Sequence, residues 1–377
     1  MHMCFRRVFL TVFATAALAG CGNKETKQAL QQAGTLEGQK QYQDANNVLV
    51  QALQAREAKI RAENPPATDP TSGDALKHKI QTDSEFLKLE RAQIMIYLHL
   101  ERADLASAVY GDILRGSPGD SVVNDTLKDK DPVIRTGAVR VLGLEGKPDA
   151  IPALTTATKD DDKDVRRAAV AALGSIKDPA SIEPLLAALK DSYWFVRSEA
   201  AEALGRQKDQ RAVKPLLDAV TDEDSNVESS AESALITLCQ APGANADDFA
   251  NRLNDPNQKV VILSAVCLAV MHDSRAIPVL IKLSSSSDLT TRLQALKGLG
   301  ESGDPAAIAV LRQTLNESDV NVRGWSIIGL GNLKDQASLT ALQAIAADPN
   351  QPPKIRAAAN ASVSNITGQR STPPNGP

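Results

Sequence analysis

Histidine is the residue type here best suited to metal binding and acid–base chemistry, and the 377-residue chain has four of them. They are His2, His78, His99 and His272. No two of them are separated by the number of residues that is typical of metal ligands. The chain also shows no motif that pairs a nucleophile with a base. The sequence therefore predicts no metal, no cofactor and no catalytic residues.

The acidic run Lys-Asp-Asp-Asp-Lys-Asp at 159–164 is the other candidate for binding a cation. It lacks the glycine-containing loop and terminal glutamate of an EF-hand calcium site. Short acidic runs more often form solvated turns whose carboxylates cap the following helix. We expect a capping turn at this position.

The amino terminus carries the pattern of an export signal. Arg6 and Arg7 precede an apolar run, 8–17, that is too short to span a bilayer, and Leu18-Ala19-Gly20-Cys21 follows. Those four residues resemble the lipobox of bacterial lipoproteins, where diacylglycerol is attached to the cysteine thiol and the chain is cut just before it. The resemblance implies a cleaved signal peptide at 1–20 and acyl chains on Cys21. The alternative is an ordinary secretory signal with Cys21 as a bystander.

The lipoprotein resemblance also implies a location. It places the mature protein in the cell envelope, anchored to the membrane through Cys21 and facing the extracytoplasmic side. Gly22 after the cysteine favours the outer membrane where the cell has one. In that oxidising setting Cys239 and Cys267 could pair. Their helical positions differ by five residues, about 7.5 Å of rise, which favours two buried thiols over a disulfide.

Composition narrows the classes of partner. The formal net charge is −4, and the basic residues are spread along the chain rather than gathered in a stripe. Aromatic residues make up 3% of the chain, too few for base-stacking platforms. Nucleic acid is therefore excluded as an expected partner.

The carboxy-terminal two thirds of the chain repeat a short frame. Each copy begins at an anchor that is usually β-branched and followed by arginine, and the steps between anchors are 31 or 33 residues. The anchors are Ile134, Val165, Val196, Val227, Val260, Thr291, Val322 and Ile355. Small or apolar residues four, seven and eight positions later complete one helix face. Apolar residues seventeen and twenty positions after the anchor predict a second helix. In the fourth copy an insertion shifts these two apolar positions to Ala246 and Phe249.

The frame also predicts the helix ends and the contacts between copies. Asp-Pro pairs at 131–132, 178–179 and 304–305 are expected to cap and start helices. Glycines nine after the anchors are expected to end the first helices in a left-handed conformation; they are Gly143, Gly174, Gly205, Gly300 and Gly331. The arginine after each anchor is expected to pair with an aspartate three before an anchor, such as Asp162, Asp224 or Asp319.

These residues resemble the HEAT-like repeats of the phycobilisome-lyase type. The strongest copies run Val165-Arg166-Arg167-Ala168-Ala169 to Gly174 and Val196-Arg197 to Gly205. The resemblance implies an all-α fold, an α-solenoid of about seven and a half stacked helical hairpins over 121–368, followed by a tail at 369–377. Hairpins of this kind bury their apolar faces only by stacking.

Residues 21–120 follow a different pattern. Ala45, Leu49 and Ala52, and later Ala106 and Tyr110, recur at helical spacing, with a proline-rich segment at 62–74 between them. Both stretches resemble the second helix of a tetratricopeptide repeat, although the tryptophan and glycine positions of the first helix are not filled. We expect a small TPR-like helical region, with a plain helical bundle as the alternative.

Two groups of residues stand out as possible partner-binding surfaces, because they are large and apolar where other copies are polar or small. They are Tyr193, Trp194, Phe195, Val261, Ile262, Leu263 and Trp325. Either they pack within the array, or they meet a partner. The sequence favours a non-catalytic, membrane-anchored scaffold for an unidentified protein partner. The alternatives are a lyase-type or maturation factor acting on a cofactor or protein, and a purely structural envelope protein.

Overall fold

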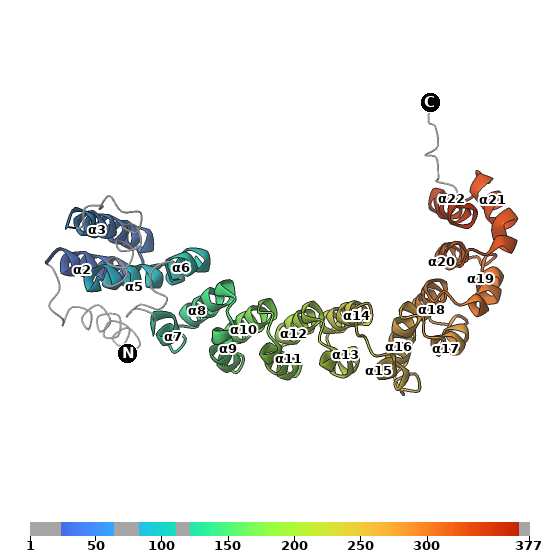
Figure 1. The fold of residues 1–377 in the computed structure, drawn as a ribbon, viewed down its shortest axis with the longest axis horizontal. Coiled ribbons are helices and arrows are strands. Elements are labelled where there is room, and N and C mark those ends of the chain that lie inside the picture. Colours follow the sequence, from blue (N-terminus) through green and yellow to red (C-terminus); the bar gives the residue numbers. More distant parts are fainter. Residues whose placement is uncertain (1–23, 64–82, 111–120, 369–377) are drawn as a thin grey trace, which may run out of the picture. The chain divides into compact units, whose positions relative to one another are not determined.

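A computed structural model describes residues 24–63, 83–110 and 121–368 of the protein. Within these residues every regular element is helical (Figure 1). Of the helices described, none combines the length and apolar character needed to cross a membrane. The leader at 1–20, Cys21, most of the proline-rich segment and the tail at 369–377 lie outside the described residues.

The chain divides into two compact units, 1–188 and 189–377. Within the described residues of the first unit, four helices precede the repeats: α2 (Lys24–Gly38), α3 (Tyr42–Glu63), α5 (Ser84–His99) and α6 (Ala103–Val109). Leu30 of α2, Leu49 of α3 and Leu89 of α5 belong to one hydrophobic core. Ala45 and Leu49 are fully buried in α3, so the helical spacing read from the sequence marks a real core face.

The repeats of the first unit follow. They comprise α7 (Ser121–Thr126), α8 (Pro132–Glu145), α9 (Ile151–Ala157), α10 (Lys163–Ser175) and α11 (Ile182–Ala188). Short 3-10 turns, Pro148–Ala150 and Pro179–Ser181, lead into α9 and α11. The frame predicts a hairpin in each copy, and in α8–α9 and α10–α11 the first helix is longer than the second.

The second unit continues the same pattern. Its first helices are α12 (Trp194–Gln207), α14 (Ser225–Cys239), α16 (Gln258–Val270), α18 (Leu289–Glu301), α20 (Val320–Asn332) and α22 (Pro353–Thr367). Its second helices are α13 (Val213–Ala219), α15 (Ala246–Ala250), α17 (Ala276–Leu283), α19 (Ile308–Thr314) and α21 (Leu339–Ala347). In Figure 1, α18, α20 and α22 succeed one another in one layer and α17, α19 and α21 in the other. The all-α fold of stacked hairpins is confirmed.

Aspartates cap several of the first helices, Asp131 among them as predicted. The other two Asp-Pro pairs, at 178–179 and 304–305, start 3-10 turns that lead into second helices. Asp131 accepts a hydrogen bond from the Val133 N–H at the start of α8, where Pro132 takes the first helical position. Asp162, from the acidic run at 159–164, caps α10 in the same way. The acidic run is therefore a capping turn.

The glycines nine after the anchors are not left-handed caps, so that prediction is wrong. They lie inside helices, at points where neighbouring first helices nearly touch. A Cβ on Gly300 of α18 would lie 2.6 Å from the Gly329 Cα of α20, and one on Gly205 of α12 would lie 2.9 Å from the Ala234 Cα of α14. The left-handed residue comes three positions later in five copies: Gly146, Lys208, His272, Gly303 and Lys334.

Arginine–aspartate pairs do link neighbouring copies, but with a different aspartate from the one predicted. Arg197 donates from Nε and Nη2 to the two carboxylate oxygens of Asp222, both at 2.7 Å. Arg135 makes the same bidentate contact with Asp160, at 2.8 and 2.7 Å. Both aspartates stand five before the next anchor. The residue three before, such as Asp224, caps its own helix, and its short side chain cannot also reach the arginine.

The fourth copy differs in structure from the others at its second helix, where its sequence carries the insertion. Its second helix, α15, is short, and Phe249 is fully buried at the position to which the insertion moves the apolar set. Cys239 at the end of α14 and Cys267 in α16 are buried free thiols. Burial raises the pKa of the Cys267 thiol well above its usual value, so Cys267 stays protonated at neutral pH.

Candidate functional site

The three consecutive aromatics pack on one another at the start of α12. The Trp194 and Phe195 rings meet edge to face, with centroids 4.9 Å apart and planes at 87°. The Tyr193 ring lies 6.0 Å from Trp194 and 6.5 Å from Phe195. All three are half-buried. Each ring covers part of its neighbours, which is a favourable arrangement for aromatic pairs, and part of the cluster remains open to solvent.

Two of the three candidate surface residues in α16 are buried in the structure. Ile262 and Leu263 are only 4% and 7% exposed, and Val261 is half-buried. Ile262 and Leu263 are therefore core residues of the second unit and offer no surface to a partner. The physical reason is that α16 is apolar around most of its circumference, and a helix of that kind must be buried on several sides.

Trp325 lies on the exposed face of the layer of first helices. It is half-buried in α20, and the Lys297 ammonium of α18 stands 5.7 Å from its ring centroid. A cation over an indole face gains electrostatic energy from the ring quadrupole. Lys297 also lies 4.0 Å from the Glu301 carboxylate on its own helix. Ile328, one turn after Trp325, is 36% exposed.

Helical geometry places these side chains on one face. Positions three, six and ten after an anchor lie within about 60° of one another around an α-helix. Trp325 and Ile328 occupy the first two of these positions in α20, and Lys297 occupies the second in α18. Glu301, Asn332 and Asn365 occupy the third position in α18, α20 and α22. We call this set the α18–α20–α22 face.

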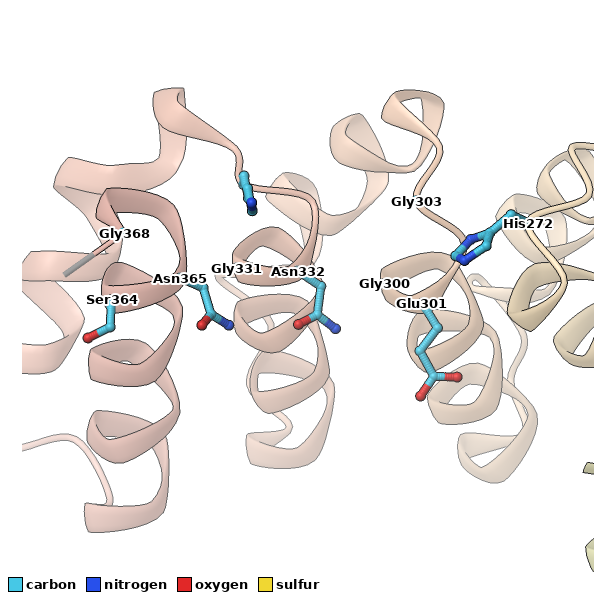
Figure 2. Close-up of a pocket in the computed structure, with 10 residues that line it drawn as sticks. His272, Gly300, Glu301, Gly303, Gly331, Asn332, Ser364, Asn365 and Gly368 are labelled. Carbon is cyan, nitrogen blue, oxygen red and sulfur yellow. The ribbon is translucent and has the colours of Figure 1, made fainter. Parts of the chain in front are cut away.

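An open groove of about 790 Å³ runs along the carboxyl ends of these helices. Figure 2 shows Glu301, Asn332 and Asn365 projecting from successive helices on the same side. Asn332 and Asn365 are exposed, and within the described residues neither side chain forms a hydrogen bond. Both amides are therefore free to donate to and accept from a ligand.

The loops after the helices supply the rest of the groove. His272 and Lys334 are left-handed, with φ of 56° and 52°, a conformation uncommon outside glycine. The His272 Nδ1 lies 2.9 Å from the Ser302 carbonyl oxygen. Because a carbonyl oxygen can only accept, Nδ1 is the donor in this contact.

The groove was missed by sequence reasoning. The tryptophan and the aromatic cluster attract attention because of their residue types, whereas asparagine and glutamate at a helix end do not. The available signal was positional: Glu301, Asn332 and Asn365 share one offset from their anchors. The structure brings them together with Lys297 and Trp325. The groove's hydrogen-bonding groups suit recognition, and in the described part of the chain no three His, Cys, Asp or Glu side chains gather as a metal site would need.

The repeated frame and its stacked hairpins agree with a family comparison. The sequence pattern described as HEAT repeats matches residues 121–174, 154–236 and 246–323, which together cover more than half of the chain. The chain belongs to the HEAT-repeat family. A comparison with curated protein sequences gives no match.

Solved structures resemble the HEAT-repeat fold of this chain at low sequence identity. The Kap95p chain of a complex with RanGDP is 13% identical with a TM-score of 0.54, and the match covers 96% of this chain and 55% of Kap95p. YibA of Escherichia coli is 22% identical over 67% of this chain and 93% of its own, with a TM-score of 0.43. The phycocyanin lyase complex of CpcE and CpcF from Nostoc is 20% identical over 65% and 94%, with a TM-score of 0.30.

Proposed function

We propose that this HEAT-repeat protein is a membrane-anchored, extracytoplasmic scaffold that binds a protein partner and does no chemistry itself. The observation that carries the proposal is the α18–α20–α22 face. It combines an accessible tryptophan, a neighbouring exposed isoleucine and a row of polar side chains with hydrogen-bonding capacity to spare. Apolar anchors inside a polar surround are the usual composition of a protein-binding surface.

Two further points support protein binding. HEAT-repeat stacks present extended surfaces built from many copies, which suits large ligands better than small ones. The similar karyopherin Kap95p is seen in complexes with RanGDP and with Nup1. In this chain, truncating a central aromatic anchor is expected to cost about 2 kcal/mol of binding free energy or more.

Site-specific photo-cross-linking in cells tests the proposal. A photoreactive residue in place of Trp325 is expected to capture one stoichiometric partner. The matched control is Gln313, which is exposed on α19, in the other layer and in the preceding repeat. Trp325→Ala should then weaken binding of the captured partner by about thirtyfold, the equivalent of ~2 kcal/mol, without unfolding the protein. Equal capture from both positions, or unchanged affinity of a folded Trp325→Ala protein, contradicts the proposal.

The membrane anchor rests on the leader and Cys21. Several acyl chains, at about 0.8 kcal/mol per buried methylene, hold a protein on a membrane stably where a single chain does not. Cys21→Ser is expected to leave the chain unprocessed or to release it from the membrane, as judged by fractionation and intact mass. A variant that still fractionates fully as a mature membrane protein would show that the anchor lies elsewhere.

A further inference from the structure

We propose that the groove at the carboxyl ends of α18, α20 and α22 binds an extended segment of the partner in the polyproline II conformation, through its main chain. This inference rests on the proposed function, because it takes the ligand to be a polypeptide. It adds the conformation of the bound segment and the side chains that recognise it.

The two asparagines supply the recognition. Asn332 and Asn365 stand at the same position of consecutive first helices, ten residues after their anchors, and both are exposed. A side-chain amide offers N–H donors and a carbonyl acceptor, the same two functions that a peptide group carries. Each asparagine can therefore hydrogen-bond one peptide unit of a chain that passes across the helix ends.

The floor of the groove lets a main chain come close. Gly300 and Gly331 line it at the ends of α18 and α20, and Gly303 lines it in the following loop. Gly300 and Gly331 are glycine because neighbouring helices touch there: a Cβ on Gly331 would lie 2.5 Å from the Ser362 Oγ. At Gly368, which also lines the groove, a Cβ would meet nothing within 4 Å, so the backbone of a ligand can approach there.

The spacing of the helices selects the conformation. Packed helices generally lie about 8–10 Å apart, and we take the same interval for equivalent side chains along the groove. A polyproline II helix completes one turn in three residues of ~3.1 Å each, or about 9.3 Å. It therefore presents the same face to each successive helix. A β-strand presents the same face about every 6.8 Å, which does not match the spacing of the helices. The main-chain groups of an α-helix are already hydrogen-bonded within the helix.

The helix α18 adds a preference for donor groups and positive charge in the ligand. Glu301 occupies on α18 the position that Asn332 occupies on α20, and its carboxylate can only accept. A segment that continues from Asn332 to α18 must therefore offer an N–H or a basic side chain one turn further on. Because proline has no N–H, the expected ligand is proline-rich with a non-proline residue at every third position.

Peptide binding to the purified full chain tests this inference. The probe is a fluorescein-labelled (Pro-Pro-Ala)4 peptide, whose N–H groups recur once per turn on one side of the helix. One control is (Gly-Gly-Ala)4, which has the same length and no preformed conformation. The other is (Pro-Ala)6, which keeps the conformation but places its N–H groups out of step with the helices. The (Pro-Pro-Ala)4 peptide is expected to bind at least tenfold more tightly than either control.

Matched variants locate the binding. Asn332→Ala with Asn365→Ala should lower the affinity at least tenfold, whereas Asn360→Ala, on another exposed face of α22, should leave it unchanged. Equal binding of the three peptides, no binding at up to about 1 mM, or an unchanged affinity of the folded double variant each overturns the inference. If the peptide fails while cross-linking from position 325 still captures one partner, the polyproline II assignment is wrong and the scaffold function stands. If both fail, both proposals are wrong.

Discussion

Glu90 is a buried acid in the amino-terminal helices. It lies in α5, which packs against α3, and its side chain is among the buried polar groups at 7% exposure. Its Oε2 has no hydrogen-bond partner in the described part of the chain. Burial raises the pKa of Glu90 to about 7, and the nearby Glu57 carboxylate of α3 adds to the shift. Ionised Glu90 is therefore costly to the fold.

The sign of the pH dependence follows from that shift. The pKa of Glu90 is higher in the folded protein, about 7, than its ordinary value of 4.5. The contribution of Glu90 to stability is then fully present below pH 4.5 and is lost as the pH rises through 7. A shift of this size corresponds to about 3 kcal/mol of unfolding free energy at most. Glu90→Gln is expected to remove most of that loss.

Chemical denaturation of the amino-terminal helices at pH 5 and pH 8 measures this effect. The native protein should lose stability between the two values, and Glu90→Gln should lose much less. Glu57→Gln is the matched control, because it removes the neighbouring charge and leaves the buried acid in place, so part of the loss should persist. Identical pH dependence in the native protein and Glu90→Gln would show that Glu90 is not the group responsible.

Close contact between consecutive first helices is the main constraint at the scale of the element. The glycine nine after an anchor meets the small residue seven after the next anchor. The pairs in contact are Gly143 with Ala172, Gly205 with Ala234, Gly300 with Gly329 and Gly331 with Ser362. Stacking of the hairpins therefore depends on pairs of residues about thirty positions apart in the sequence. An added methyl group at these contacts would overlap with the neighbouring helix.

Gly300→Ala should destabilise the second unit. Alanine is a better helix former than glycine by about 1 kcal/mol, but its Cβ would lie 2.6 Å from the Gly329 Cα, an atom that cannot rotate away. Overpacking of this kind costs about 1–3 kcal/mol, occasionally more, so we expect a net loss of stability. Gly324→Ala is the matched control, since its Cβ would come no closer than 3.6 Å to the Ile355 Cδ1. It should stabilise by about 0.5–1 kcal/mol, as measured by thermal unfolding. A stabilised Gly300→Ala protein would contradict the packing argument.

Most of the fold could be predicted from the sequence because the frame repeats. Eight copies give eight chances to see the same helical periodicity, five of their first helices begin with a capping aspartate, and stacking follows from the apolar face. The function of the repeated glycines could not be predicted in the same way. A glycine near a helix end fits both a left-handed cap and a helix–helix contact, and only the position of the neighbouring helix decides between them.

The candidate site was harder to predict, for a related reason. Ile262 and Leu263 differ from their counterparts in residue type, but the sequence of one helix does not tell how many sides its neighbours cover. Asn332 and Asn365 are ordinary surface residues taken singly. They become a site because stacked helices place them in one row, and that row is a property of the assembly of elements.

At the scale of the whole molecule, a repeat stack distributes its stability over local contacts. Each hairpin contacts mainly its neighbours, so stability is close to a sum of hairpin terms and interface terms. The chain also divides into two compact units, 1–188 and 189–377. Glu90 belongs to the first unit and Gly300 to the second. A change at either residue should therefore be felt in its own unit.

Hydrogen exchange of the full chain tests whether each substitution affects only the unit that contains it. In Gly300→Ala, amide protection is expected to fall in α18 and α20, which share the perturbed contact, and in α22, which packs on α20. The helices α8 and α10 of the first unit should keep their native protection. In Glu90→Gln at pH 8, protection should rise in α3 and α5 and stay unchanged in α18 and α20. The two substitutions made together should give the sum of the separate effects, because distant sites without shared contacts add. If either substitution changes protection evenly across both units, the chain unfolds as one cooperative body. In that case the α18–α20–α22 face could not loosen to accept a ligand without a cost spread over the entire molecule.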